Sequence, residues 1–133
     1  MNDCLFCRIV AGELPTEFVD ADDAAVAFLD IAPLQPGHTL IVSRRHVPNA
    51  LADPVVLADL APMISRVGRR LIDRLDADGL NVLTNVGEAS GQSVFHLHVH
   101  LIPRFADRPG IEGMLQRPEG IDNAAVLARV RGE

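Results

Sequence analysis

The chain has 133 residues, a length typical of one domain with a single core, and a formal net charge of −6. The acidic balance argues against a broad nucleic-acid-binding surface, and no apolar run is long enough to span a membrane. All 12 basic residues are Arg, which excludes a P-loop lysine and Schiff-base chemistry.

The N-terminus is unlike a signal peptide, so we expect a cytoplasmic protein that binds neither membranes nor nucleic acid. In the first half of the chain, Gly12 ends a short helix, and two prolines and a glycine make residues 32–37 a loop. His38 therefore lies where a loop meets a strand. The elements predicted in this half are a helix over 4–11 and strands over 17–20, 24–30 and 38–43.

The second half is predicted to open on a helix that begins at Asp53-Pro54 and continues to Leu75. Pro62 should break this helix near Asp59, because proline cannot supply an interior helical amide. The elements predicted after it are strands over 80–86 and 94–102, the second stopped by Pro103, a loop over 87–91 and a short helix from Asp122.

The order of helix, strands, helix and strands predicts an α+β fold, with an antiparallel sheet and helices packed on one side. We assign residues 1–105 to this domain. Residues 106–133 are expected to be a C-terminal tail of the same domain, irregular over 106–121, where glycine and proline are frequent.

Three of the five histidines alternate with apolar residues in His96-Leu97-His98-Val99-His100. In a strand these three imidazoles share one face, and the apolar side chains share the other. Neutral imidazoles can ligate a metal, or they can serve as nucleophile and hydrogen-bond donors, since their pKa is about 6.5. Just upstream, Gln92 and Ser93 in a glycine-containing loop offer neutral donors suited to phosphate oxygens.

Cys4 and Cys7 form a Cys-x-x-Cys pair near the N-terminus. A structural disulfide framework is not expected in a chain without an export signal. The residues themselves leave two interpretations open, namely half of a metal site and a redox pair.

These segments resemble the histidine triad (HIT) nucleotide-binding proteins, in the Hint-like branch that carries a Cys-x-x-Cys zinc pair. The resemblance rests first on Gly91-Gln92-Ser93-Val94-Phe95-His96-Leu97-His98-Val99-His100. Further blocks match in the family's order, at residues 4–13, 28–33, 36–42 and 102–104.

The resemblance implies that His98 attacks the α-phosphorus of a nucleotide, giving a nucleotidyl-histidine intermediate that water then hydrolyses. It further implies that His100 and His38 donate to the non-bridging phosphate oxygens, where charge builds up in the transition state. Ser93 would contact the leaving group, and Gln92 would contact a phosphate oxygen.

For the nucleoside, the resemblance places Asp30 on the ribose hydroxyls and Asn85 near the phosphates. It also implies an apolar slot for a purine ring, which packing of these residues in the core would equally explain. The residues of this slot are Leu5, Phe6, Ile9, Phe28 and Ile31.

The resemblance also implies a structural zinc ion bound by Cys4, Cys7, His46 and His96, with no open coordination position. Two cysteines without a metal are the alternative, and a redox role is disfavoured because no thioredoxin-like strand precedes Cys4. Family members of this type are usually homodimers, and we expect the same here.

The function implied is hydrolysis of purine nucleoside 5'-phosphoramidates. A dinucleoside polyphosphate hydrolase would use the same histidine, and a non-catalytic nucleotide-binding regulatory module is a further alternative. A catalytic metal on the histidine row is disfavoured, because no Asp or Glu lies between Ser90 and Arg104 to act as the base. Residues 106–133 lack the tryptophan frequent in the C-terminal segment of phosphoramidases, which leaves substrate choice open.

Overall fold

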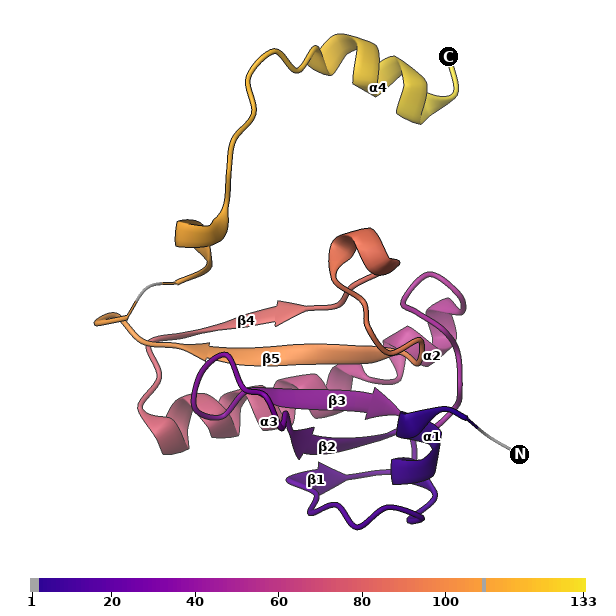
Figure 1. The fold of residues 1–133 in the computed structure, drawn as a ribbon, viewed down its shortest axis with the longest axis vertical. Coiled ribbons are helices and arrows are strands. Elements are labelled where there is room, and N and C mark those ends of the chain that lie inside the picture. Colours follow the sequence, from indigo (N-terminus) through magenta and orange to yellow (C-terminus); the bar gives the residue numbers. More distant parts are fainter. Residues whose placement is uncertain (1–2, 109) are drawn as a thin grey trace.

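The computed structural model describes residues 3–108 and 110–133. Its centre is an antiparallel five-stranded sheet with the strand order β1-β2-β3-β5-β4 (Figure 1). This confirms the predicted α+β fold. The strands are β1 Asp20–Ala21, β2 Ala25–Leu29, β3 Thr39–Ser43, β4 Gly79–Leu83 and β5 His98–Arg104.

Helices α2 (Pro54–Ala58) and α3 (Ala61–Leu75) pack on one face of the sheet. As predicted, the helical region begins at Asp53, whose carboxylate caps α2 by accepting from the Val55 amide, and it is interrupted before Pro62. Apolar side chains of α3 and of alternate positions in the central strands form the main core. Examples are Met63, Val67, Ile41 and Val99.

The short helix α1 (Leu5–Val10) packs on the opposite face of the sheet, where Phe6 and Ile9 contact Val26, Phe28 and Leu40. Strand β2 is therefore buried on both faces over Ala25–Phe28. This second, smaller core holds α1 against the sheet next to His98, whose ring the Phe6 ring contacts edge-on.

Strand β5 begins at His98, four residues later than predicted, because the Leu97 amide donates to the Val47 carbonyl (2.8 Å) outside the ladder. The prediction that Pro103 stops the strand is also wrong. Pairing with β3 reaches only Leu101, so Pro103 lies opposite β4 alone and its missing amide removes no bond to β3.

Two other predicted strands are shorter than expected. The segment 17–20 contributes only its last residue to β1, and the strand predicted over 80–86 ends at Leu83. Beyond Leu83, the Thr84 hydroxyl donates to the His98 carbonyl (2.7 Å). A side-chain hydrogen bond therefore links the two segments where the backbone pairing of β4 with β5 ends.

After β5 the chain leads away from the sheet, and Figure 1 shows α4 (Asn123–Arg131) lying apart from it. A single turn of 3-10 helix, Ile111–Met114, interrupts the predicted irregular segment. The Asp122 carboxylate caps α4, confirming the predicted start of this helix. Across the described ranges, no helix combines the length and apolar character needed to cross a bilayer.

Candidate nucleotide-binding and metal-binding site

A cavity of about 460 Å³ lies where α1 meets the ends of β2, β3 and β5. All five residues predicted for the apolar slot line it, as do Asp30, Ser93, His98 and His100. Sequence reasoning missed Leu14, Pro15, Thr16, Leu29, Leu40 and Val94. Of these, Leu40 could have been found, because it lies two residues after His38 and so shares a strand face with it.

His98 is buried at the start of β5, and one of its ring nitrogens is held by the backbone. Nδ1 lies 2.7 Å from the His96 carbonyl oxygen, which accepts only, so Nδ1 donates and Nε2 carries the lone pair. Burial lowers the pKa of His98, which keeps the imidazole neutral near pH 7. The cavity is therefore lined by a neutral imidazole of defined tautomer.

His38 and His100 are ordered by a chain of hydrogen bonds that starts on the backbone. The Leu34 amide donates to His38 Nδ1 (3.1 Å), so the His38 proton is on Nε2. That proton is donated to His100 Nδ1 (2.9 Å), which leaves Nε2–H of His100 as a donor. Burial, with His98 and His38 as neighbours, lowers the pKa of His100 to about 4.

His38, for which donation to a phosphate oxygen is expected, is engaged by protein groups in this arrangement. Both ring nitrogens of His38 are used by protein groups, and Asp30 Oδ2 lies 3.6 Å from Nε2. His38 is 3% exposed and is not among the residues that line the cavity. It lies behind His100 and orients it.

Gln92, for which a contact to a phosphate oxygen is expected, is also held by protein groups. Gln92 is 4% exposed; its Oε1 accepts from the Gly87 amide (2.9 Å), and its Nε2 donates to the carbonyls of Pro48 (2.7 Å) and Val94 (3.0 Å). With these bonds made, Gln92 braces the loop that precedes the histidines.

The other two polar residues of this region differ in position. Ser93 is exposed and lines the cavity. Asn85 does not line it; its side-chain amide lies next to Gly91, 3.5 Å from where a Cβ would be. Gly91 has a φ of +108°, a backbone conformation that favours glycine over residues with a Cβ.

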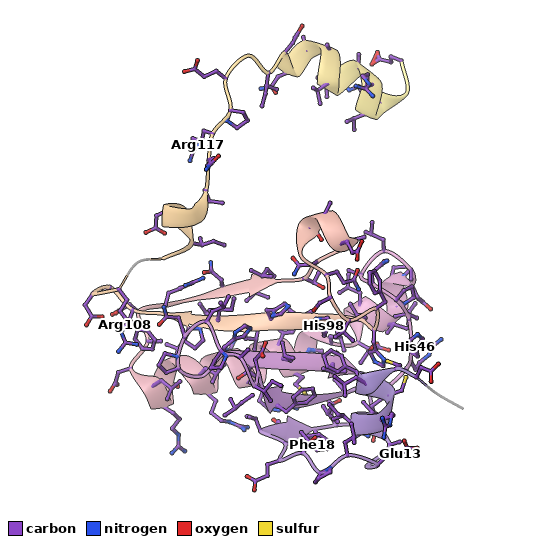
Figure 2. The ribbon with its side chains drawn as sticks, in the orientation of Figure 1. Glu13, Phe18, His46, His98, Arg108 and Arg117 are labelled. Atoms are coloured by element: carbon purple, nitrogen blue, oxygen red, sulfur yellow. The ribbon has the colours of Figure 1, made fainter. Side chains whose placement is uncertain are left out.

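Cys4, Cys7, His46 and His96 converge into one cluster, although His96 lies before β5 and not in it. His96 Nδ1 is 3.3 Å from Cys4 Sγ and 3.4 Å from Cys7 Sγ, and His46 Nδ1 is 3.2 Å from Cys7 Sγ. In Figure 2, His46 lies next to α1, with sulfur atoms beside it.

The donor set and spacing of this cluster fit a tetrahedral metal ion. Around a tetrahedral zinc ion, with bonds of about 2.3 Å to sulfur and 2.0–2.1 Å to nitrogen, a sulfur and a nitrogen ligand lie about 3.6 Å apart and two nitrogen ligands about 3.3 Å apart. The two Nδ1 atoms are 3.1 Å apart. His96 Nε2 donates to the Ser43 carbonyl (2.6 Å), which leaves the Nδ1 lone pair directed to the cluster.

Comparison with known proteins finds a matching family model and similar proteins. The HIT domain matches residues 11–107. "Protein hit" of Bacillus subtilis is 36% identical over 129 residues, covering 92% of this chain and 89% of that protein. Adenylylsulfatase HINT3 of Arabidopsis thaliana is 38% identical over 104 residues, covering 77% of this chain and 53% of that protein.

Among solved structures, SMU.412c from Streptococcus mutans UA159 superposes with a TM-score of 0.86 and 41% identity, covering 99% of this chain and 83% of that chain. The similarity to HINT3 supports the Hint-like branch. The match of the domain to most of the chain, together with these relatives, shows that this protein belongs to the HIT family.

Proposed function

We propose that the protein hydrolyses purine nucleoside 5'-phosphoramidates at the α-phosphate through a nucleotidyl-His98 intermediate. The observation that carries this proposal is the hydrogen bond from His98 Nδ1 to the His96 carbonyl. It leaves the basic Nε2 on a neutral imidazole in the wall of a cavity with an apolar slot. A fixed, neutral ring nitrogen is what nucleophilic attack on phosphorus requires.

In the first step, His98 Nε2 forms a bond to the α-phosphorus while the P–N bond to the leaving amine breaks, and the amine takes up a proton from solvent water. An equivalent proton returns to solvent in the second step, when water adds to phosphorus. In the second step, water attacks phosphorus, the bond to His98 breaks, and the nucleoside monophosphate leaves with the imidazole neutral again. In this proposal Ser93 contacts the leaving group, which is supported by its exposure in the lining of the cavity.

His100 stabilises the charge that builds up on the phosphate oxygens, by donating from Nε2–H. His38 acts through His100 because its own donor is used on His100 Nδ1. A His38→Phe variant keeps a ring but removes this bond. We expect it to lower kcat more than it raises KM, since the bond matters most when charge develops.

Asp30 binds the ribose hydroxyls in this proposal. Its Oδ1 accepts from the Ala32 amide (2.9 Å), which holds the carboxylate at the cavity wall. Asp30→Asn should weaken nucleotide affinity by about 1–3 kcal/mol, the scale of hydrogen bonds to a charged group. The relative whose name is adenylylsulfatase supports an adenylyl-bearing substrate for this site.

We also propose that Cys4, Cys7, His46 and His96 hold a structural zinc ion. With four protein ligands it would supply structural stability and no open position for catalysis. Cys4→Ala should lose bound zinc, whereas His98→Ala should keep it, as measured by metal analysis of the purified proteins. The reverse pattern would indicate a catalytic metal on the histidine row.

The proposed reaction is tested with an adenosine 5'-phosphoramidate that bears a fluorogenic amine. Wild-type protein should release the amine, and His98→Ala should not. Phe95→Ala is the matched control, because Phe95 is 48% exposed in the same segment and does not line the cavity. Release by His98→Ala at the wild-type rate would overturn the assignment of His98 as the nucleophile. If wild type releases no amine, phosphoramidates are not the substrate, and dinucleoside polyphosphates are tested next.

We further propose that the protein is a cytoplasmic homodimer that does not bind nucleic acid, with residues 106–133 belonging to the same domain as 1–105. The net charge of −6 supports the absence of nucleic-acid binding. The position of β4 at an edge of the sheet, with Val82 52% exposed, supports association through that strand. Light scattering at several protein concentrations tests the dimer.

A further inference from the structure

We propose that the cluster of Cys4, Cys7, His46 and His96 positions the nucleotide site, so that binding of a metal ion and binding of a nucleotide strengthen each other. The proposal rests on the proposed function, because it takes the cavity beside α1 to be the nucleotide site. Two separate connections between cluster and cavity carry it.

The first connection is α1. Its N-cap residue is Cys4, whose Sγ accepts from the Cys7 amide (3.4 Å), so the cluster lies at the first turn of the helix. The same helix contributes Leu5, Phe6 and Ile9 to the cavity. A helix of six residues has little stability of its own, so its position depends on what anchors it.

The second connection is His96, which takes part in both sites. Its imidazole faces the cysteines in the cluster, while its carbonyl oxygen accepts the hydrogen bond that sets the tautomer of His98. The Phe6 ring contacts both imidazoles edge-on, with centroids 6.0 Å from His96 and 4.9 Å from His98. A ligand that fixes His96 therefore also fixes the backbone and ring that hold His98.

These connections predict a reciprocal coupling. A metal ion that orders α1 and His96 removes part of the ordering cost of nucleotide binding, and a nucleotide does the same for the metal. Thermodynamic linkage requires the two affinities to change by the same factor. We expect about tenfold, within the usual range for coupled sites.

His46 isolates the coupling from direct contact with the nucleotide. It is exposed, it belongs to the cluster, and it does not line the cavity. His46 is thus a positioning residue, acting on the nucleotide only through the other ligands. Its neighbour Arg45 is a matched control, since it is also exposed and its side chain makes a long ion pair to Asp53 (3.8 Å).

The experiment uses AMP as the nucleotide and zinc as the metal. The dissociation constant of AMP is measured by calorimetry for zinc-loaded wild type, His46→Ala and Arg45→Ala. Zinc affinity of wild type is measured by competition with a chromophoric chelator, with and without saturating AMP. We expect His46→Ala to bind AMP about tenfold more weakly, Arg45→Ala to be unchanged, and AMP to tighten zinc binding about tenfold.

If His46→Ala fails to fold, the zinc competition on wild type decides by itself, because AMP must tighten zinc binding in a folded protein. AMP that binds but leaves zinc affinity unchanged overturns the coupling and leaves the proposed function standing. AMP that does not bind to the zinc-loaded protein overturns the proposed function, and the coupling with it.

Discussion

Replacement of Gln92 by methionine tests whether this buried amide is a structural brace or a phosphate ligand. Methionine preserves the side-chain length and bulk but removes the hydrogen bonds to Gly87, Pro48 and Val94. Each such bond contributes about 1 kcal/mol net, so Gln92→Met should cost about 3 kcal/mol of unfolding free energy. For a domain of 133 residues this lowers Tm by about 10 °C.

The assay is thermal and urea unfolding, with turnover measured well below the unfolding transition. Ser93→Ala is the control, since Ser93 is the exposed neighbour that lines the cavity; its Tm should stay within about 2 °C of wild type. A Gln92→Met protein with the wild-type Tm and greatly reduced kcat would refute the reasoning, because that result requires the amide to contact the substrate.

Two further predictions concern backbone geometry and pH. Gly37→Ala should destabilise the protein far more than Gly12→Ala in urea unfolding: both glycines have positive φ, but a Cβ at Gly37 collides with the Leu75 side chain, whereas Gly12 has open space. Comparable losses would contradict this. Folding lowers the pKa of His100 to about 4, below the value of about 6.5 in the unfolded chain. As pH drops from about 6.5 to 4, the unfolded state therefore binds a proton that the folded state does not, and the free energy of unfolding should fall. His100→Asn should make that fall shallower, and an unchanged pH dependence would count against the burial of His100.

Much of the local structure could be predicted because it depends on neighbouring residues. The cap at Asp53 and the break before Pro62 follow from backbone hydrogen bonding within a few positions. The position of His38 directly before β3, which begins at Thr39, follows in the same way from the prolines before it. The two-residue period places His98 and His100 on one strand face, and the cavity receives both.

The roles of the polar side chains could not be predicted in this way. Gln92 has a motif position suited to phosphate, yet its partner is the carbonyl of Pro48, 44 residues earlier in the chain. His38 meets His100 across 62 residues. Which atoms meet at such separations depends on strand register and on the packing of loops against the sheet.

By itself the sequence determined the family resemblance, the α+β class and the residue types available for chemistry. Only the tertiary structure decided that His96 lies before strand β5, and that its backbone carbonyl holds the His98 imidazole. The physical reason is that a propensity acts over a few residues, whereas a buried donor takes whichever acceptor the folded chain brings to it.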